Sequence, residues 1–134
     1  MPGKIKYKEG YKYQLAEMYS FQTGIVGEVT NSGYVSLDLD GTLNIMPGYA
    51  WDGASGPAFD TLNFRRGTLV HDALYQLIRE GLIGIQHRRA ADRLLHSICR
   101  EDGMSAIRAW WVYQGVRFGG GAAVETENPI LTAP

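Results

Sequence analysis

The side chains best suited to chemistry lie in two short segments in the second half of the chain. His71 and Asp72 are adjacent, Tyr75 follows four residues after the histidine, and Asp92 comes later. An imidazole can act as a general base, while nearby carboxylates can orient its ring or bind a hard cation through oxygen. Together these residue types are typical of a metal-assisted hydrolytic site.

Three helices are predicted in this half, because apolar residues recur there at helical spacing. The predicted ranges are about 64–80, 86–102 and 105–118, and Gly81 and Gly103 are natural stops for the first two. His71 and Tyr75 lie one turn apart on the first helix and therefore share a face. The short link to the second helix favours antiparallel packing, which would bring Asp92 toward them.

The first half of the chain has a different pattern. Short alternating apolar segments separated by glycines predict strands over residues 1–50. We therefore expect an α+β fold in a single domain, 1–134, with an N-terminal antiparallel sheet packed on three C-terminal helices, the first two antiparallel. Residues 51–120 would form a loop and the three helices, and residues 121–134 an extended tail.

One motif in the strand region favours a turn over an enzyme. The segment LDLDGTL, residues 37–43, matches the nucleophile signature of haloacid dehalogenase-like phosphatases, but all four lysines precede it and the required later lysine is missing. A hairpin explains the same letters better. We predict that Leu39 pairs with Leu43 and Leu37 with Ile45, around a loop of residues 40–42.

Composition narrows the possible partners. A net charge of -1 over 134 residues gives no concentrated basic surface, so we expect no nucleic acid partner. Cys99 is the only cysteine, which leaves no intrachain disulfide. No stretch reaches the length of a membrane span, and we expect no transmembrane segment.

Two other interpretations use the same polar residues. Asp92 and Tyr75 could simply satisfy a half-buried His71 in a structural network. Alternatively, Asp92, His96 and His71 could form a zinc set, although the tight spacing of most zinc histidines is missing. His87 is then more simply a surface residue at a helix N-terminus.

Aromatic residues gather toward the end of the third predicted helix. Trp110, Trp111, Tyr113 and Phe118 could form an interfacial membrane anchor. Core packing is the commoner use of such side chains.

At the loop DGASGP, the run HDALY and the aspartate of the second helix, the chain resembles secreted-type phospholipase A2 enzymes, especially the small prokaryotic branch. The resemblance covers roughly residues 51–100. It implies that His71 is the general base that activates water. It also implies that Asp92 orients the imidazole ring with support from Tyr75.

The same resemblance implies a calcium site. Asp72 and Asp52, with backbone carbonyls near Gly53, would hold Ca2+, and the cation would polarise the ester carbonyl and stabilise the oxyanion. Asp52 could instead be an ordinary turn residue. Ala54 and Leu74 stand where members of that family have half-cystines.

The whole chain more closely resembles an uncharacterised family of phage and prophage proteins with DGAS, HD and AD signatures. This resemblance leaves three functions open. The first is a Ca2+-dependent ester hydrolase with a phospholipid or cell-envelope substrate. The second is a virion or tail structural or assembly protein that contacts other virion proteins, and the third is a peptidoglycan-directed metal hydrolase of the lysis phase. We expect synthesis in the host cytoplasm, followed by packaging in a virion or release at lysis.

Overall fold

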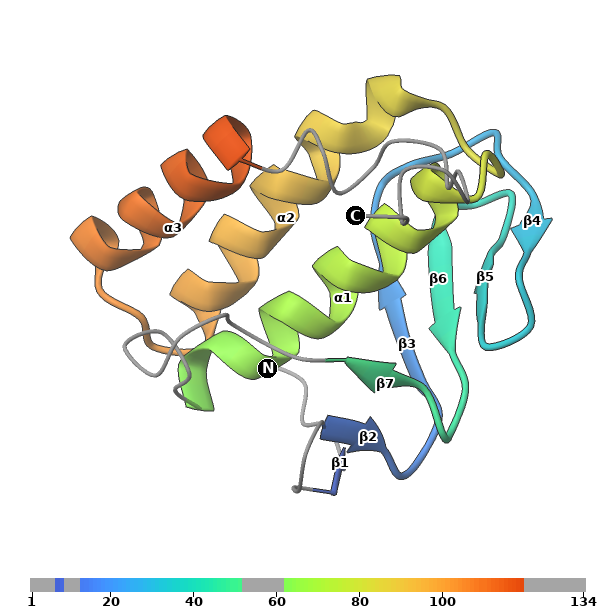
Figure 1. The fold of residues 1–134 in the computed structure, drawn as a ribbon, viewed down its shortest axis with the longest axis horizontal. Helices are drawn as coiled ribbons and strands as arrows, with labels where there is room; N and C mark the ends of the chain where they lie inside the picture. Colours follow the sequence, from blue (N-terminus) through green and yellow to red (C-terminus); the bar gives the residue numbers. More distant parts are fainter. Residues whose placement is uncertain (1–6, 9–12, 52–61, 120–134) are drawn as a thin grey trace, which may run out of the picture.

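A computed structural model describes residues 7–8, 13–51 and 62–119. These residues form an α+β fold of two small antiparallel sheets and three α-helices (Figure 1). The strands are β1 (Tyr7–Lys8), β2 (Tyr13–Leu15), β3 (Tyr19–Gln22), β4 (Thr30–Asn31), β5 (Val35–Leu37), β6 (Thr42–Ile45) and β7 (Ala50–Trp51). The helices are α1 (Leu62–Arg79), α2 (Arg88–Glu101) and α3 (Ala106–Gly119), with a short 3-10 turn η2 (Ile85–His87) before α2.

The sheets stand on one side of α1, and α2 and α3 follow in succession on the other side (Figure 1). One sheet has the strand order β1-β2-β7 and the other β3-β6-β5-β4. Alternation along β5 and β6 turns their apolar side chains inward, where they meet the apolar face of α1. This core includes Val35, Leu37, Leu43, Ile45, Leu69, Val70, Ala73, Leu74 and Leu77.

The hairpin between β5 and β6 exists, but its predicted register is wrong. Leu37 pairs with Leu43, whereas the sequence suggested Leu39 for that position. Gly41 takes a positive φ of 95°, and the Asp38 amide bonds to the Thr42 carbonyl, so residues 38–41 form the turn. Leu39 is thereby placed in the turn and is 62% exposed. The two-residue shift leaves the same face of each strand buried, because side chains alternate with a period of two.

The first two helices pack antiparallel, as the spacing predicted (Figure 1). Each is followed by a glycine of positive φ, Gly81 at 76° and Gly103 at 103°, which ends the helix in a left-handed conformation. The close approach of α1 to α2 depends on Gly67 of α1. A Cβ added there would lie 3.0 Å from both the Cys99 Sγ and the Leu95 Cδ1 of α2. None of the helices in the described part of the chain is long and apolar enough to span a membrane.

Candidate functional site

A buried hydrogen-bond network joins α1 to α2. The Nε2 atom of His71 lies 2.7 Å from Oδ1 of Asp92, and the Tyr75 hydroxyl donates to the same oxygen over 2.6 Å. The His71 and Tyr75 rings are in contact, with centroids 4.0 Å apart. The structure thus brings together the three residues that the sequence selected, while their catalytic roles stay predictions.

Two arginines complete the network, and the sequence analysis had missed both. Arg117 of α3 donates from Nη1 to Oδ2 of Asp92 over 2.8 Å. Arg88 donates from Nε to the Tyr75 hydroxyl over 3.2 Å, and its Nη2 atom donates to the carbonyls of Val116 and Arg117. The spacing of Arg88 to Asp92, one helical turn, was the only available signal. Nothing in the sequence could link Arg117 to a residue so far along the chain.

The environment fixes the charge of Asp92. Burial alone would raise the pKa of this carboxyl, but hydrogen bonds from His71 and Tyr75, the charge of the His71 ring and a hydrogen bond from Arg117 hold it below its usual value. Asp92 is therefore an ionised acceptor. An ionised carboxylate cannot donate, so Nε2 of His71 must carry the proton in their shared hydrogen bond.

The pKa of His71 is shifted in the opposite direction. Burial favours the neutral ring, but the carboxylates of Asp72 and Asp92 outweigh it and raise the pKa of His71. Tyr75 remains a donor, because burial and the neighbouring Asp92 raise the pKa of its hydroxyl. Asp92 is therefore ionised, and His71 has an increased proton affinity. Tyr75 is neutral and donates its hydrogen bond to Asp92.

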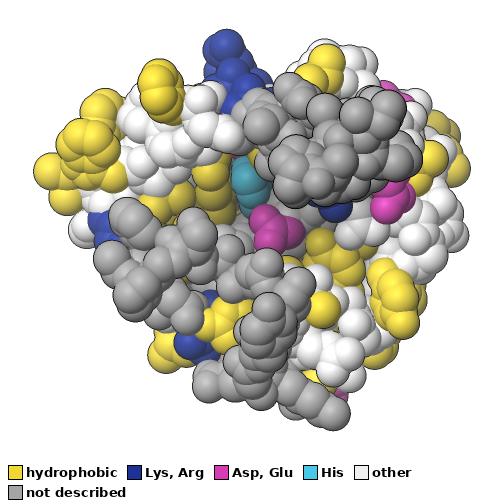
Figure 2. Space-filling model, in the orientation of Figure 1, with side chains coloured by type: hydrophobic (Ala, Val, Ile, Leu, Met, Phe, Trp, Pro, Cys, Tyr) yellow, Lys and Arg dark blue, Asp and Glu magenta, His cyan; other side chains and the backbone are white. Residues whose placement is uncertain are grey.

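The second nitrogen of His71 faces a different environment. In the neutral ring Nδ1 carries the free lone pair, and it lies 3.6 Å from Oδ1 of Asp72. The Asp72 side chain is 36% exposed, whereas the whole of His71 is only 6% exposed. Figure 2 shows a histidine and an acidic side chain side by side near the centre of this face, between α1 and α2. A basic nitrogen and a partly exposed carboxylate therefore meet at the edge of the network.

Only one of the three residues predicted to bind calcium lies in the described part of the chain. Asp72 is an available oxygen ligand, while Asp52 and Gly53 lie outside the described residues. Within the described ranges, no group of three or more histidine, cysteine or acidic side chains could hold a metal ion. Asp92, His96 and His71 are all described, and they form no such group.

The other two histidines serve elsewhere. The His96 ring packs edge-on against Tyr113 of α3, with centroids 6.1 Å apart. His87, at the start of α2, pairs through Nε2 with Oε2 of Glu28 over 2.8 Å. Its predicted place at a helix N-terminus is confirmed.

Comparison with protein families gives a match over most of the described chain. A model of the family described as "Protein of unknown function (DUF1353)" matches residues 29–116, from just before β4 to near the end of α3. The matched range contains His71, Asp72, Tyr75, Arg88 and Asp92. No curated protein and no solved structure matches the chain.

Proposed function

Because the chain belongs to the DUF1353 family, whose function is unknown, we propose its function from the site itself: a hydrolase that activates water with His71 and Asp92. One observation carries the proposal. The hydrogen bond of His71 Nε2 to Asp92 leaves Nδ1 as the proton acceptor, 3.6 Å from the partly exposed Asp72 carboxylate. Asp92, His71 and Asp72 therefore form one continuous line of contacts. They would supply the group that orients the ring, the base and a potential metal ligand.

Each residue has a defined part in this reaction. Nδ1 of His71 removes a proton from water as the oxygen attacks an ester carbonyl, and the imidazolium later returns that proton to the leaving alkoxide. Asp92 holds the ring in the required tautomer and stabilises the imidazolium. Tyr75 and Arg117 keep Asp92 ionised and fixed, because both donate hydrogen bonds to it.

The substrate class comes from the resemblance to phospholipase A2 enzymes. We propose a Ca2+-dependent ester hydrolase acting on phospholipid or another cell-envelope ester, encoded by a phage or prophage. Bound calcium would supply Lewis-acid polarisation of the carbonyl. Asp72 would be one ligand, and Asp52 and the carbonyls near Gly53 would be the others.

Replacing His71 by Asn tests the catalytic part. The variant should release fatty acid from mixed phospholipid vesicles in calcium about a hundredfold to ten-thousandfold more slowly than wild type, since it lacks the base. His87→Asn is the matched control, because His87 bonds to Glu28 outside the network. Wild-type protein that cleaves no ester in millimolar calcium would refute the hydrolase.

Asp72→Asn tests the metal part independently of turnover. Calcium should raise the melting temperature of the wild type by mass action, and Asp72→Asn should reduce that shift. Asp38→Asn, in the exposed turn after β5, is the control for removal of one carboxylate. An equal calcium shift in Asp72→Asn and wild type would exclude this residue as a ligand.

A virion structural or assembly protein is the second candidate, and one observation favours it. His71 is 6% exposed and Asp92 is fully buried, as expected if the network only stabilises the core. His71→Asn would then lower the free energy of unfolding by about 1–3 kcal/mol, and the wild type would hydrolyse no ester. The hydrolase predicts the reverse pattern, a large loss of rate with little change in stability.

A further inference from the structure

Helix α3 is apolar on two opposite faces. Ala109 and Val112 are buried against α2, and Val116 packs beside them. The opposite face carries Ile107, Trp110, Trp111 and Phe118, which are 70%, 49%, 60% and 97% exposed. Core packing, the commoner expectation for these aromatics, is therefore wrong for Trp110, Trp111 and Phe118.

These exposed residues share one side of the helix, with Gln114 between Trp111 and Phe118. Positions 110, 111 and 118 lie three, four and eleven residues after position 107, and all four fall within about 100° around a helix. Figure 2 shows hydrophobic side chains gathered along the edge of the molecule formed by α3. We call Ile107, Trp110, Trp111 and Phe118 the outer stripe. A large exposed apolar patch of this kind often marks an interaction site.

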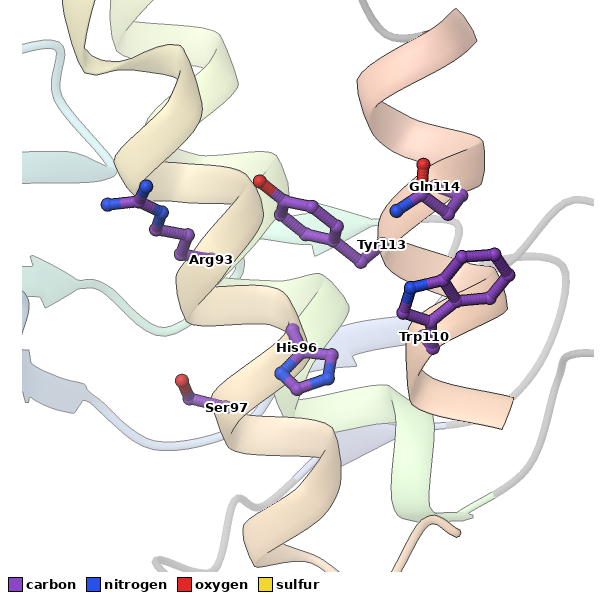
Figure 3. A pocket seen from close by; sticks show the side chains of 6 residues that line it. All are labelled: Arg93, His96, Ser97, Trp110, Tyr113 and Gln114. Atoms are coloured by element: carbon purple, nitrogen blue, oxygen red, sulfur yellow. The ribbon is translucent and has the colours of Figure 1, made fainter. Parts of the chain in front are cut away.

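A groove between α2 and α3 adjoins the outer stripe. It encloses about 420 Å³ and is lined by Arg93, His96 and Ser97 of α2 and by Trp110, Tyr113 and Gln114 of α3. Figure 3 shows the His96 and Tyr113 rings reaching into the space between the helices, with Trp110 and Gln114 on one side and Arg93 and Ser97 on the other. Most of these groups can donate a hydrogen bond to an anion.

The charges around this face are unbalanced. Helix α3 contains no Asp or Glu. Of the acidic residues of α2, Asp92 is fully buried in the network and Glu101 is bound to Arg66 of α1. Arg89 and Arg93 are exposed on α2. The outer surface of the two helices therefore presents cations and aromatic rings, and Glu101, the exposed acidic side chain of α2, is already paired with Arg66.

We propose that the α2–α3 face docks on an anionic lipid surface. The outer stripe would enter the boundary between headgroups and acyl chains, and the groove would receive an anionic headgroup beside Arg93. Tryptophan suits this depth because its ring is apolar while its N–H can still find a polar partner. Arginine near the membrane surface adds attraction to anionic lipids.

Charge argues against a second copy of the chain as the occupant. A two-fold dimer through this face would bring the exposed arginines of both copies into one interface, where like charges repel. A membrane supplies the missing negative charge. The proposal does not depend on hydrolysis, so His71→Asn should bind vesicles as the wild type does.

Vesicle flotation tests the outer stripe. The wild type should float with phosphatidylglycerol–phosphatidylcholine vesicles at low salt and more weakly with phosphatidylcholine alone. The double variant Trp111→Ser, Phe118→Ser should bind anionic vesicles at least roughly tenfold more weakly. The control is Val29→Ser, Leu39→Ser, which removes two exposed apolar residues from the sheet region and should bind as wild type.

A charge variant tests the headgroup contact. Arg93→Gln should weaken partitioning into anionic vesicles about fivefold, whereas Arg79→Gln at the end of α1 should have little effect. Failure of the folded wild-type monomer to bind anionic vesicles would overturn the proposal. So would a dimer in sedimentation velocity that the double stripe variant dissociates, if vesicle binding is absent.

Discussion

Replacing Asp92 by Asn probes the network at its centre. The side chain is fully buried, its Oδ1 accepts from His71 over 2.7 Å and from Tyr75 over 2.6 Å, and its Oδ2 accepts from Arg117 over 2.8 Å. Asparagine has nearly the same shape but is neutral, and its NH2 group is a donor. One of the three surrounding donors must then face another donor, and Arg117 loses its counter-charge.

The cost follows from burial and geometry. Removing one partner of a buried ion pair typically costs about 3–5 kcal/mol, because a charge is left without compensation. The Arg117 side chain is 25% exposed, so water recovers part of that loss and the low end applies. We expect Asp92→Asn to lower the free energy of unfolding by about 3 kcal/mol. The corresponding fall in melting temperature is roughly 10 °C for a chain of this size.

Urea denaturation at neutral pH measures this loss. Asp38→Asn is the control, because Asp38 is exposed and should change stability by less than about 0.5 kcal/mol. The folded pKa of Asp92 lies below its ordinary value of 3.8, so its contribution is present above pH 3.8 and is lost as pH falls through the folded pKa. The free energies of unfolding of the wild type and of Asp92→Asn, plotted against pH, should therefore converge only in acid. An Asp92→Asn variant as stable as Asp38→Asn at neutral pH would refute the network as a stabilising element.

Three further predictions concern the neighbouring residues. The raised pKa of His71 predicts a ring titration by NMR with a midpoint above 6.5, and its contribution to stability is complete below pH 6.5 and lost as pH rises through the folded pKa. A midpoint below 6.5 would show that burial outweighs the carboxylates. Gly67→Ala should destabilise the protein by about 1–3 kcal/mol in thermal melts, since its Cβ would lie 3.0 Å from Leu95 and Cys99, whereas Gly115→Ala, with no neighbour within 4 Å, should be neutral or stabilising. Equal effects at the two glycines would contradict the close packing of α1 on α2. Burial raises the pKa of Cys99 to about 12, so a thiol reagent at pH 8 should label the unfolded protein and leave the native one unreacted.

The sequence was a good guide wherever a short periodic pattern determined the structure. The helical spacing placed His71 and Tyr75 on one face, and the short link after Gly81 was enough to predict that Asp92 would approach them. The α+β arrangement followed in the same way from the change in period near residue 50. Such inferences depend on neighbours within a few residues, which a single sequence displays.

Other features depended on information that no local pattern contains. Both candidate registers of the β5–β6 hairpin bury the same faces, so periodicity could not separate them, and the backbone conformation of Gly41 decided between them. Arg117 reaches Asp92 through the packing of α3 on α2. The sequence also could not predict that Trp111 is exposed, because an apolar stripe has the same sequence pattern whether another helix or solvent faces it.

The hydrogen bonds between α3 and the Asp92 network have a practical consequence for protein engineering. Arg88 binds the last carbonyls of α3, and Arg117 supplies one of the donors to Asp92. The α1–α2 pair is therefore not a self-sufficient module in this chain. A graft of α1 and α2 alone into another scaffold would carry a buried carboxylate with one donor missing, and the recipient would have to provide a cation in its place.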